Sequence, residues 1–102
     1  MLIVLTTTSN QADGEALAVK LVEAKLAACV QVLPRMTSVY MWEGRVTRDG
    51  EHLVLIKTLP EEWEALQAFI TANHPYRIPE IVAIESAAVS GPYLEWIKDV
   101  LA

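Results

Sequence analysis

The sequence predicts an α+β sandwich built by one domain, residues 1–102. Residues 29–58 are rich in β-branched, aromatic and aliphatic side chains, which favour strands. The stretches on either side, residues 10–28 and 60–73, carry apolar residues at helical spacing. A chain of 102 residues is long enough to bury a real core. We therefore expect helices packed on an antiparallel sheet.

The chain opens with an expected buried strand over residues 2–8, which ends in three consecutive threonines. Ser9 or Asn10 is a suitable N-cap for the next helix, and acidic residues in its first turn suit the helix dipole. This helix is predicted to run to about Ala28. Its many alanines predict close packing on a sheet, and its apolar stripe consists of Leu17, Leu21, Ala24 and Ala28.

Residues 29–58 are predicted to form one long β-hairpin. Two turn candidates compete inside it, Glu43-Gly44 and Asp49-Gly50, because glycine supplies the positive φ of a tight turn. A turn at 49–50 would leave residues 29–40 without a partner. We therefore place the turn at 43–44 and interpret Asp49-Gly50 as a bulge in the second arm. The expected opposite pairs are then Trp42 with Arg45, Leu33 with Val54, and Cys29 with Thr58.

The arms of this hairpin are longer than the roughly 5–6 residues of an ordinary strand. Its tip is therefore expected to project beyond the core. A projecting ribbon has open edges, which need another chain or a cover. Self-association is the first functional inference from the sequence.

The remaining elements follow from proline and glycine positions. Pro60 suits the first turn of a second helix, and Pro75 ends it because the residue before proline avoids the helical region. A tight connector over residues 74–79 leads to a short strand, Glu80 to Ser86. Gly91-Pro92 opens a last helix, whose Leu94, Ile97 and Leu101 share one face. The short strand is expected to bury Ile81, Val82, Ala83 and Ile84.

The order strand, helix, strand, strand, helix, strand matches a ferredoxin-like βαββαβ sandwich with a long hairpin between the second and third strands and an added C-terminal helix. These connections place two groups of residues at opposite ends of the sheet. One end is expected to gather Thr6 to Thr8, Tyr40, Trp42, His74, Tyr76 and Glu80. The other end is expected to hold Cys29, Lys57 and Thr58.

Composition narrows the function classes. Hydrophobic residues make up 53% of the chain, more than an isolated small domain needs, which fits surface buried against other subunits. The net charge of −5 argues against nucleic acid as the main partner. A single cysteine, apolar runs too short for a membrane and a start without a basic signal-peptide region predict the cytoplasm.

His74 is the most suggestive single residue. A neutral imidazole near a carboxylate such as Glu80 can hold a transition metal, but we favour a cation at the C-terminal end of a helix, because one His and one Glu fall short of a full ligand set. Cys29 and His74 would make a second candidate metal pair, but the topology separates them within one subunit. A buried apolar cysteine is therefore the favoured interpretation of Cys29.

Tyr40 and Trp42 lie two residues apart and share one face of their strand. Exposed aromatic side chains on a ribbon are typical interface anchors, and we favour packing over ligand stacking. Lys57 is better interpreted as a snorkelling lysine or as the partner of a carboxylate than as a catalytic lysine. The sequence contains no spacing of a Ser/His/Asp set and no glycine-rich phosphate loop, so we expect no enzyme.

Five motifs in order resemble the CutA divalent-cation tolerance family over nearly the whole chain. They are Ala27-Ala28-Cys29-Val30, the stretch Ser38 to Gly44, Ile56-Lys57-Thr58, His74-Pro75-Tyr76 with Pro79-Glu80-Ile81, and Tyr93-Leu94-Glu95-Trp96. The resemblance implies a ferredoxin-like fold related to PII signalling proteins. It implies a cytoplasmic homotrimer with an interface on Ser38, Tyr40 and Trp42, whose hairpins pair between subunits. It also implies a link to tolerance of copper and other divalent cations, without catalytic residues.

This chain departs from the family pattern at the candidate metal site. Metal-binding members can carry a cysteine where this chain has Thr6 and a histidine where it has Asn73. Arg77 replaces an acidic residue, which adds a positive charge. The leading hypothesis is therefore a trimer with a weak or adaptable site for copper or another divalent cation, formed by His74 and Glu80, with no cofactor required.

Two further hypotheses stay open. The chain can be a PII-like regulatory or scaffold trimer, which binds a small molecule or a partner protein in clefts between subunits. An acylphosphatase-like hydrolase on the same fold is the third, although its phosphate loop is missing.

Overall fold

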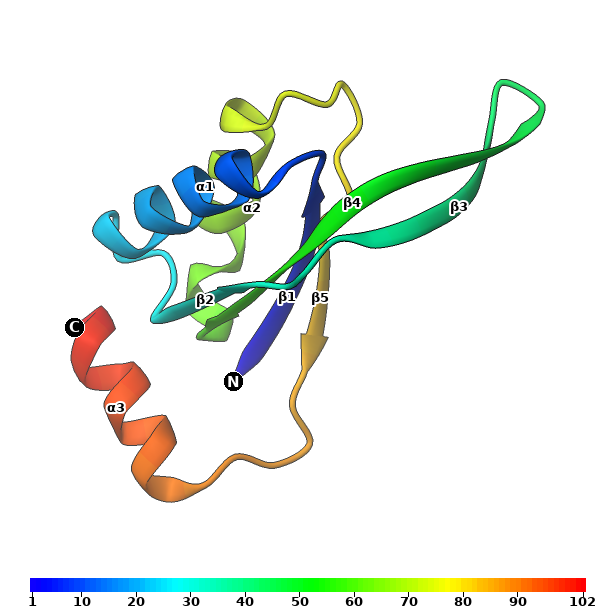
Figure 1. Cartoon of the computed structure of the whole chain (residues 1–102). Coiled ribbons are helices and arrows are strands. Elements are labelled where there is room, and N and C mark those ends of the chain that lie inside the picture. Colours follow the sequence, from blue (N-terminus) through cyan, green and yellow to red (C-terminus); the bar gives the residue numbers. More distant parts are fainter.

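In the computed structural model, residues 1–102 build a mixed α+β fold around an antiparallel sheet of five strands (Figure 1). Strand order is β2-β4-β1-β5, and β3 pairs with the outer half of β4. The elements are β1 Leu2–Thr8, α1 Gln11–Glu23, β2 Cys29–Val32, β3 Met36–Trp42, β4 Arg45–Thr58, a 3-10 turn Pro60–Glu62, α2 Trp63–Asn73, β5 Val82–Glu85 and α3 Gly91–Leu101.

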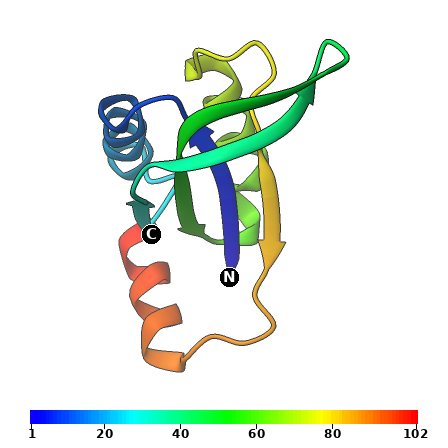
Figure 2. The same ribbon diagram turned by 45° about the vertical axis from the view of Figure 1, so that its right-hand side comes forward.

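The core lies between the sheet and the helices α1 and α2, which cover the same face of it (Figure 1). Alternate residues of β1, such as Val4 and Thr6, are fully buried under these helices, as the pleat of a strand requires. Their partners in the core come from all the central elements: Leu17, Leu21, Ala27, Val54, Ile56, Leu66 and Ile70. Helix α3 stands apart at the N-terminal end of β1 and buries Ile97 (Figure 2).

The helix α1 ends earlier than the sequence indicated. Asn10 is the N-cap, and its side chain accepts a hydrogen bond from the Asp13 N–H, as predicted. The predicted end at Ala28 was wrong, because Lys25 adopts a positive φ of 57° two residues after the last helical residue, Glu23. A left-handed residue stops a helix, and the chain turns there into β2.

The tight turn at Glu43-Gly44 is confirmed. Both residues have positive φ, 49° and 77°, and Trp42 pairs with Arg45. Positive φ at both central positions gives the twist that suits a two-residue hairpin. The ribbon of β3 and the outer half of β4 therefore projects from the body as the sequence predicted (Figure 1).

The position of the bulge was predicted wrongly. Residues 49–50 pair regularly with residues 37–38, whereas the pairing shifts by one residue around Pro34. Three residues, 33–35, lie opposite only two, 52–53, so Val54 pairs with Val32 and not with Leu33. Proline has no N–H to donate to the ladder, which makes it the natural place for the irregularity.

This shift also changes the inner end of the hairpin, where Cys29 pairs with Lys57 and not with Thr58. The His52 ring donates from Nδ1 to the carbonyl of Leu33 over 2.9 Å, which supports the chain at the irregularity.

The strand after the connector is shorter and more exposed than predicted. It spans Val82–Glu85 and not residues 80–86, and the side chains of Val82 and Ile84 are 46% and 49% exposed. The prediction that these side chains are buried was wrong because Val82 and Ile84 pair with Leu5 and Ile3, on the face of the sheet that the helices leave open. None of the helices has the length and apolar character needed to cross a membrane.

Candidate functional site

His74 lies where α2 ends and the connector to β5 begins, because Pro75 prevents a further helical turn. Its imidazole is buried and has two main-chain partners. Nε2 donates to the carbonyl of Thr7 over 2.6 Å, and Nδ1 accepts from the N–H of Tyr76 over 3.0 Å. The ring thus joins the end of β1 to the connector.

These partners define the state of the ring. A carbonyl oxygen only accepts and a backbone N–H only donates, so His74 is the neutral tautomer with its proton on Nε2. The interpretation of His74 as a cation at the helix end does not describe this geometry, since its donor bond goes to β1. A metal ion at Nδ1 would have to displace the N–H of Tyr76.

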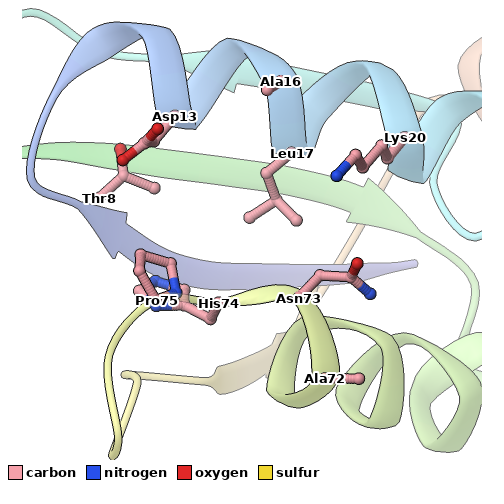
Figure 3. A pocket seen from close by; sticks show the side chains of 9 residues that line it. All are labelled: Thr8, Asp13, Ala16, Leu17, Lys20, Ala72, Asn73, His74 and Pro75. Carbon is pink, nitrogen blue, oxygen red and sulfur yellow. The ribbon is translucent and has the colours of Figure 1, made fainter.

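The ring borders a cavity of about 330 Å³ between α1 and the end of α2 (Figure 3). Leu17 lies between the charged side chains of Asp13 and Lys20 on the α1 side. On the other side, Asn73 donates its side-chain N–H to the Phe69 carbonyl of its own helix. The polar groups of this cavity are therefore mostly helix-end groups.

Thr6 is fully buried, and its hydroxyl has no hydrogen-bond partner. A buried hydroxyl without a hydrogen-bond partner destabilises a core. A hydroxyl is also a poorer ligand for copper than a thiolate. No group of three His, Cys, Asp or Glu side chains converges anywhere in the chain.

A second and larger cavity of about 820 Å³ lies between the β3–β4 ribbon and the connector. It brings together Thr7, Tyr40, Trp42, Tyr76 and Glu80, which confirms most of the predicted gathering at one end of the sheet. Glu80 lines this cavity and His74 lines the smaller one, so the proposed metal pair does not share a cavity.

Two tyrosine–carboxylate contacts shape the larger cavity. Tyr76 donates its hydroxyl to the buried Glu51 carboxylate over 2.9 Å, and the Tyr40 hydroxyl donates to Asp49. Burial, followed by the bond to Glu51, raises the pKa of Tyr76 to about 12. The bond to Asp49 is the main cause that raises the pKa of Tyr40 above its usual value. Both phenols are therefore neutral donors at physiological pH.

The opposite end of the sheet holds Cys29 and Lys57, as predicted. The two residues are direct partners on neighbouring strands, and the Lys57 ammonium lies 5.7 Å from the ring centre of Tyr93. This cation–π contact gives the Lys57 ammonium a structural partner. His74 contacts Thr7, whose partner on β4 is Leu53, whereas the partner of Cys29 on β4 is Lys57, four residues further along. Cys29 and His74 therefore do not meet.

The ribbon has a second face, which the sequence-based prediction did not include. Ser38, Tyr40 and Trp42 line the larger cavity, and the most exposed apolar side chains of the ribbon alternate with them along the strands, although one of these, Val39, also lines the cavity. These are Val39, Met41 and Val46, each about 60% exposed (59%, 65% and 62%). The period-2 alternation of a strand was the signal that could have identified this face.

Comparison with known proteins gives one consistent answer. The family model of the CutA1 divalent ion tolerance protein matches residues 2–100. The chloroplastic protein CutA of Arabidopsis thaliana is 43% identical over 96% of this chain, which spans about half (54%) of that relative. The divalent-cation tolerance protein CutA of Thermus thermophilus is 40% identical, with 95% of this chain and 94% of the relative covered.

Solved structures agree with the sequence relatives. The crystal structure of CutA1 from Oryza sativa superposes with a TM-score of 0.94 at 40% identity, covering 97% of this chain and 91% of that one. CutA1 from Ehrlichia chaffeensis gives a TM-score of 0.95 at 30% identity, covering 99% and 94%.

Proposed function

The chain belongs to the CutA1 divalent ion tolerance family, and from this we propose a non-catalytic, cytoplasmic homotrimer that takes part in tolerance of copper and other divalent cations. The observation that carries this proposal is the match over nearly the full length to a bacterial relative named for divalent-cation tolerance. The role proposed is weak cation binding and response.

The finer fold assignment is a ferredoxin-like sandwich related to PII proteins. The strand order β2-β4-β1-β5, with antiparallel neighbours throughout and two helices on one face, supports it. Right-handed crossovers through α1 and α2 connect the strands of such a sandwich.

Open strand edges and exposed apolar side chains support the trimer. β3 and β5 each have a single strand neighbour, so two different edges of the sheet offer free main-chain groups. A contact between two different edges is heterologous, and such contacts close into a ring when the rotation between neighbouring copies closes. The apolar ribbon face of Val39, Met41 and Val46 supplies surface that water disfavours.

Assembly can be tested by light scattering on a dilution series of ribbon variants. Trp42→Ala and Met41→Asp are expected to dissociate the trimer at concentrations where the wild type stays assembled. Val19→Asp is the matched control, because Val19 is 55% exposed on α1, away from the ribbon. Equal masses for all four proteins at every concentration would exclude the ribbon as the interface.

The donor set around His74 does not fit a tight copper site. Both ring nitrogens are engaged, Thr6 offers a hydroxyl, and the amide of Asn73 is bound to its own helix. We therefore propose weak binding through His74, with Glu80 joining only after the connector rearranges. No further chemistry is assigned to the ion.

Copper titration of two histidine variants tests this site. His74→Ala is expected to lose most of the copper uptake, whereas His52→Gln removes the only other histidine and is expected to keep it. Unchanged uptake in His74→Ala would remove His74 from the site. Far-UV circular dichroism of both variants shows whether each is still folded, so that unfolding is not mistaken for loss of the copper site.

A PII-like regulatory or scaffold trimer is the second candidate. The aromatic and acidic cavity of about 820 Å³ favours it, since ligand sites are concave and combine apolar walls with a few polar groups. A thermal-shift screen that finds neither a stabilising small molecule nor a partner protein would count against this candidate.

A further inference from the structure

We propose that the larger cavity, between the β3–β4 ribbon and the connector, binds a flexible organic cation with two or more amino groups, that is, a diamine or polyamine. The proposal rests on the small-molecule alternative given above and names its ligand class. It does not depend on metal binding at His74.

The larger cavity has an acidic lining. Three carboxylates, those of Asp49, Glu51 and Glu80, line the cavity against one guanidinium, that of Arg77. The side chain of Glu51 is only 9% exposed, and its hydrogen-bond partner is the neutral hydroxyl of Tyr76. A buried carboxylate with a neutral partner retains much of its desolvation cost. A bound ammonium would supply the missing positive charge.

The walls of the larger cavity are aromatic. Tyr40 and Trp42 come from the ribbon and Tyr76 from the connector, so aromatic rings face the cavity from both sides. Aromatic faces attract ammonium groups and also cover methylene groups. An organic amine has both parts, whereas a hydrated metal ion has only the charge.

The three carboxylates of the larger cavity are set apart from one another. Asp49 and Glu51 lie two residues apart on one strand, which corresponds to roughly 7 Å. Glu80 comes from a different segment, after the connector. Side chains placed in this way suit several cationic centres separated by short methylene chains. The elongated shape of a polyamine matches this arrangement.

Assembly is compatible with this assignment. The two faces of the ribbon differ, and the apolar ribbon face is the more exposed one. Tyr40 and Trp42 face the cavity, so in the proposed trimer a second copy would border its mouth. A cationic side chain of that copy is the competing occupant, and the experiment must exclude it.

Isothermal titration of the full chain with spermidine tests the proposal, with butylamine as the single-charge control. Spermidine is expected to bind at least tenfold more tightly than butylamine. Glu51→Gln keeps an oxygen that accepts from Tyr76 but removes the charge, and it is expected to weaken spermidine binding about tenfold or more. Asp49→Asn is the second variant, should Glu51→Gln fail to fold.

Glu64→Gln is the matched control, since it removes one exposed charge on α2 and is expected to bind spermidine like the wild type. Three titration results would overturn the proposal. They are absence of spermidine binding to the wild type, equal weakening in Glu64→Gln, and displacement of spermidine by equimolar Mg²⁺. A crystal structure with a second copy's Arg or Lys in the cavity would do the same. Native mass and copper uptake of the wild type, measured alongside, report the proposed function separately.

Discussion

Replacing His74 by alanine is expected to destabilise the protein by about 2–3 kcal/mol, with or without metal present. The imidazole makes two buried hydrogen bonds to main-chain groups, the carbonyl of Thr7 and the N–H of Tyr76. A typical buried hydrogen bond contributes about 1 kcal/mol net, and a group left without a partner costs about 1–3 kcal/mol. Alanine removes both bonds, and Thr7 is itself buried.

Urea unfolding followed by far-UV circular dichroism measures this loss. The protein concentration must be held constant, because assembly makes apparent stability depend on it. The urea concentration at the unfolding midpoint is expected to fall, while the slope of the unfolding free energy against urea concentration stays unchanged. His74→Gln can still donate to the Thr7 carbonyl, and His74→Asn can still accept from Tyr76, so each is expected to recover about half of the loss.

Asn73→Ala is the control for this series. Its side chain bonds to the carbonyl of Phe69 on an exposed part of the same helix, so the expected loss is below about 0.5 kcal/mol. If His74→Ala unfolds with the same midpoint as Asn73→Ala, the proposed link between β1 and the connector is refuted. The same result would leave a ligand role as the remaining reason for a histidine here.

Three further predictions concern other parts of the fold. Burial raises the pKa of Tyr76 to about 12, above its ordinary value of about 10, so its contribution to stability is present below pH 10 and is lost as the pH rises toward 12. Absorbance titration of a variant whose other tyrosines are phenylalanine should show a midpoint near 12, and a midpoint near 10 would contradict the buried bond. Gly14→Ala places a methyl group 2.9 Å from the Thr8 hydroxyl and is expected to cost about 1 kcal/mol in urea unfolding, whereas Gly91→Ala meets open space and should be neutral; equal midpoints would show that the helix shifts freely. Thr58→Val removes a buried hydrogen bond of 2.8 Å to the chain after α1, with an expected loss of about 1 kcal/mol, and unchanged stability would mean that water replaces it.

Local signals in the sequence were sufficient for most of the fold. Glu43-Gly44 determined the hairpin turn because glycine accepts positive φ at low cost, and Asn10 and Pro75 marked helix ends through capping and ring geometry. The order of helices and strands along the chain then implied which strand ends and connections lie at the same end of the sheet. The gathering of Tyr40, Trp42, Tyr76 and Glu80 around one cavity follows from that order alone.

Features that depend on tertiary contacts were not predictable. The register shift adds one residue to the first arm at Pro34; proline is a local signal for such an irregularity, but it does not give the size of the shift. Lys25 ends α1 with positive φ, which is unusual for a lysine, and the N–H groups of Lys25 and Leu26 close the helix on the carbonyls of Val22 and Leu21. Exposure of Val82 and Ile84 was hidden because an apolar run looks the same in a central strand and in an edge strand.

The candidate site shows the same division. The sequence identified His74 as a chemically important position, but it could not show that both ring nitrogens have main-chain partners. Those partners are Thr7, far away in the chain, and Tyr76, two residues on. The acidic cavity also depends on Glu51, whose burial beside Tyr76 arises only when the ribbon and the connector come together.

Native mass spectrometry of the purified protein, with and without added copper, measures both the assembly of the chain and its uptake of metal. The proposed function predicts a trimer of the 11.3 kDa chain that takes up about one copper ion per subunit and releases it on mild dilution. A trimer that stays free of metal at every copper concentration would contradict the cation-binding role and leave the regulatory candidate. A monomer would contradict the assembly proposed from the open strand edges and the ribbon.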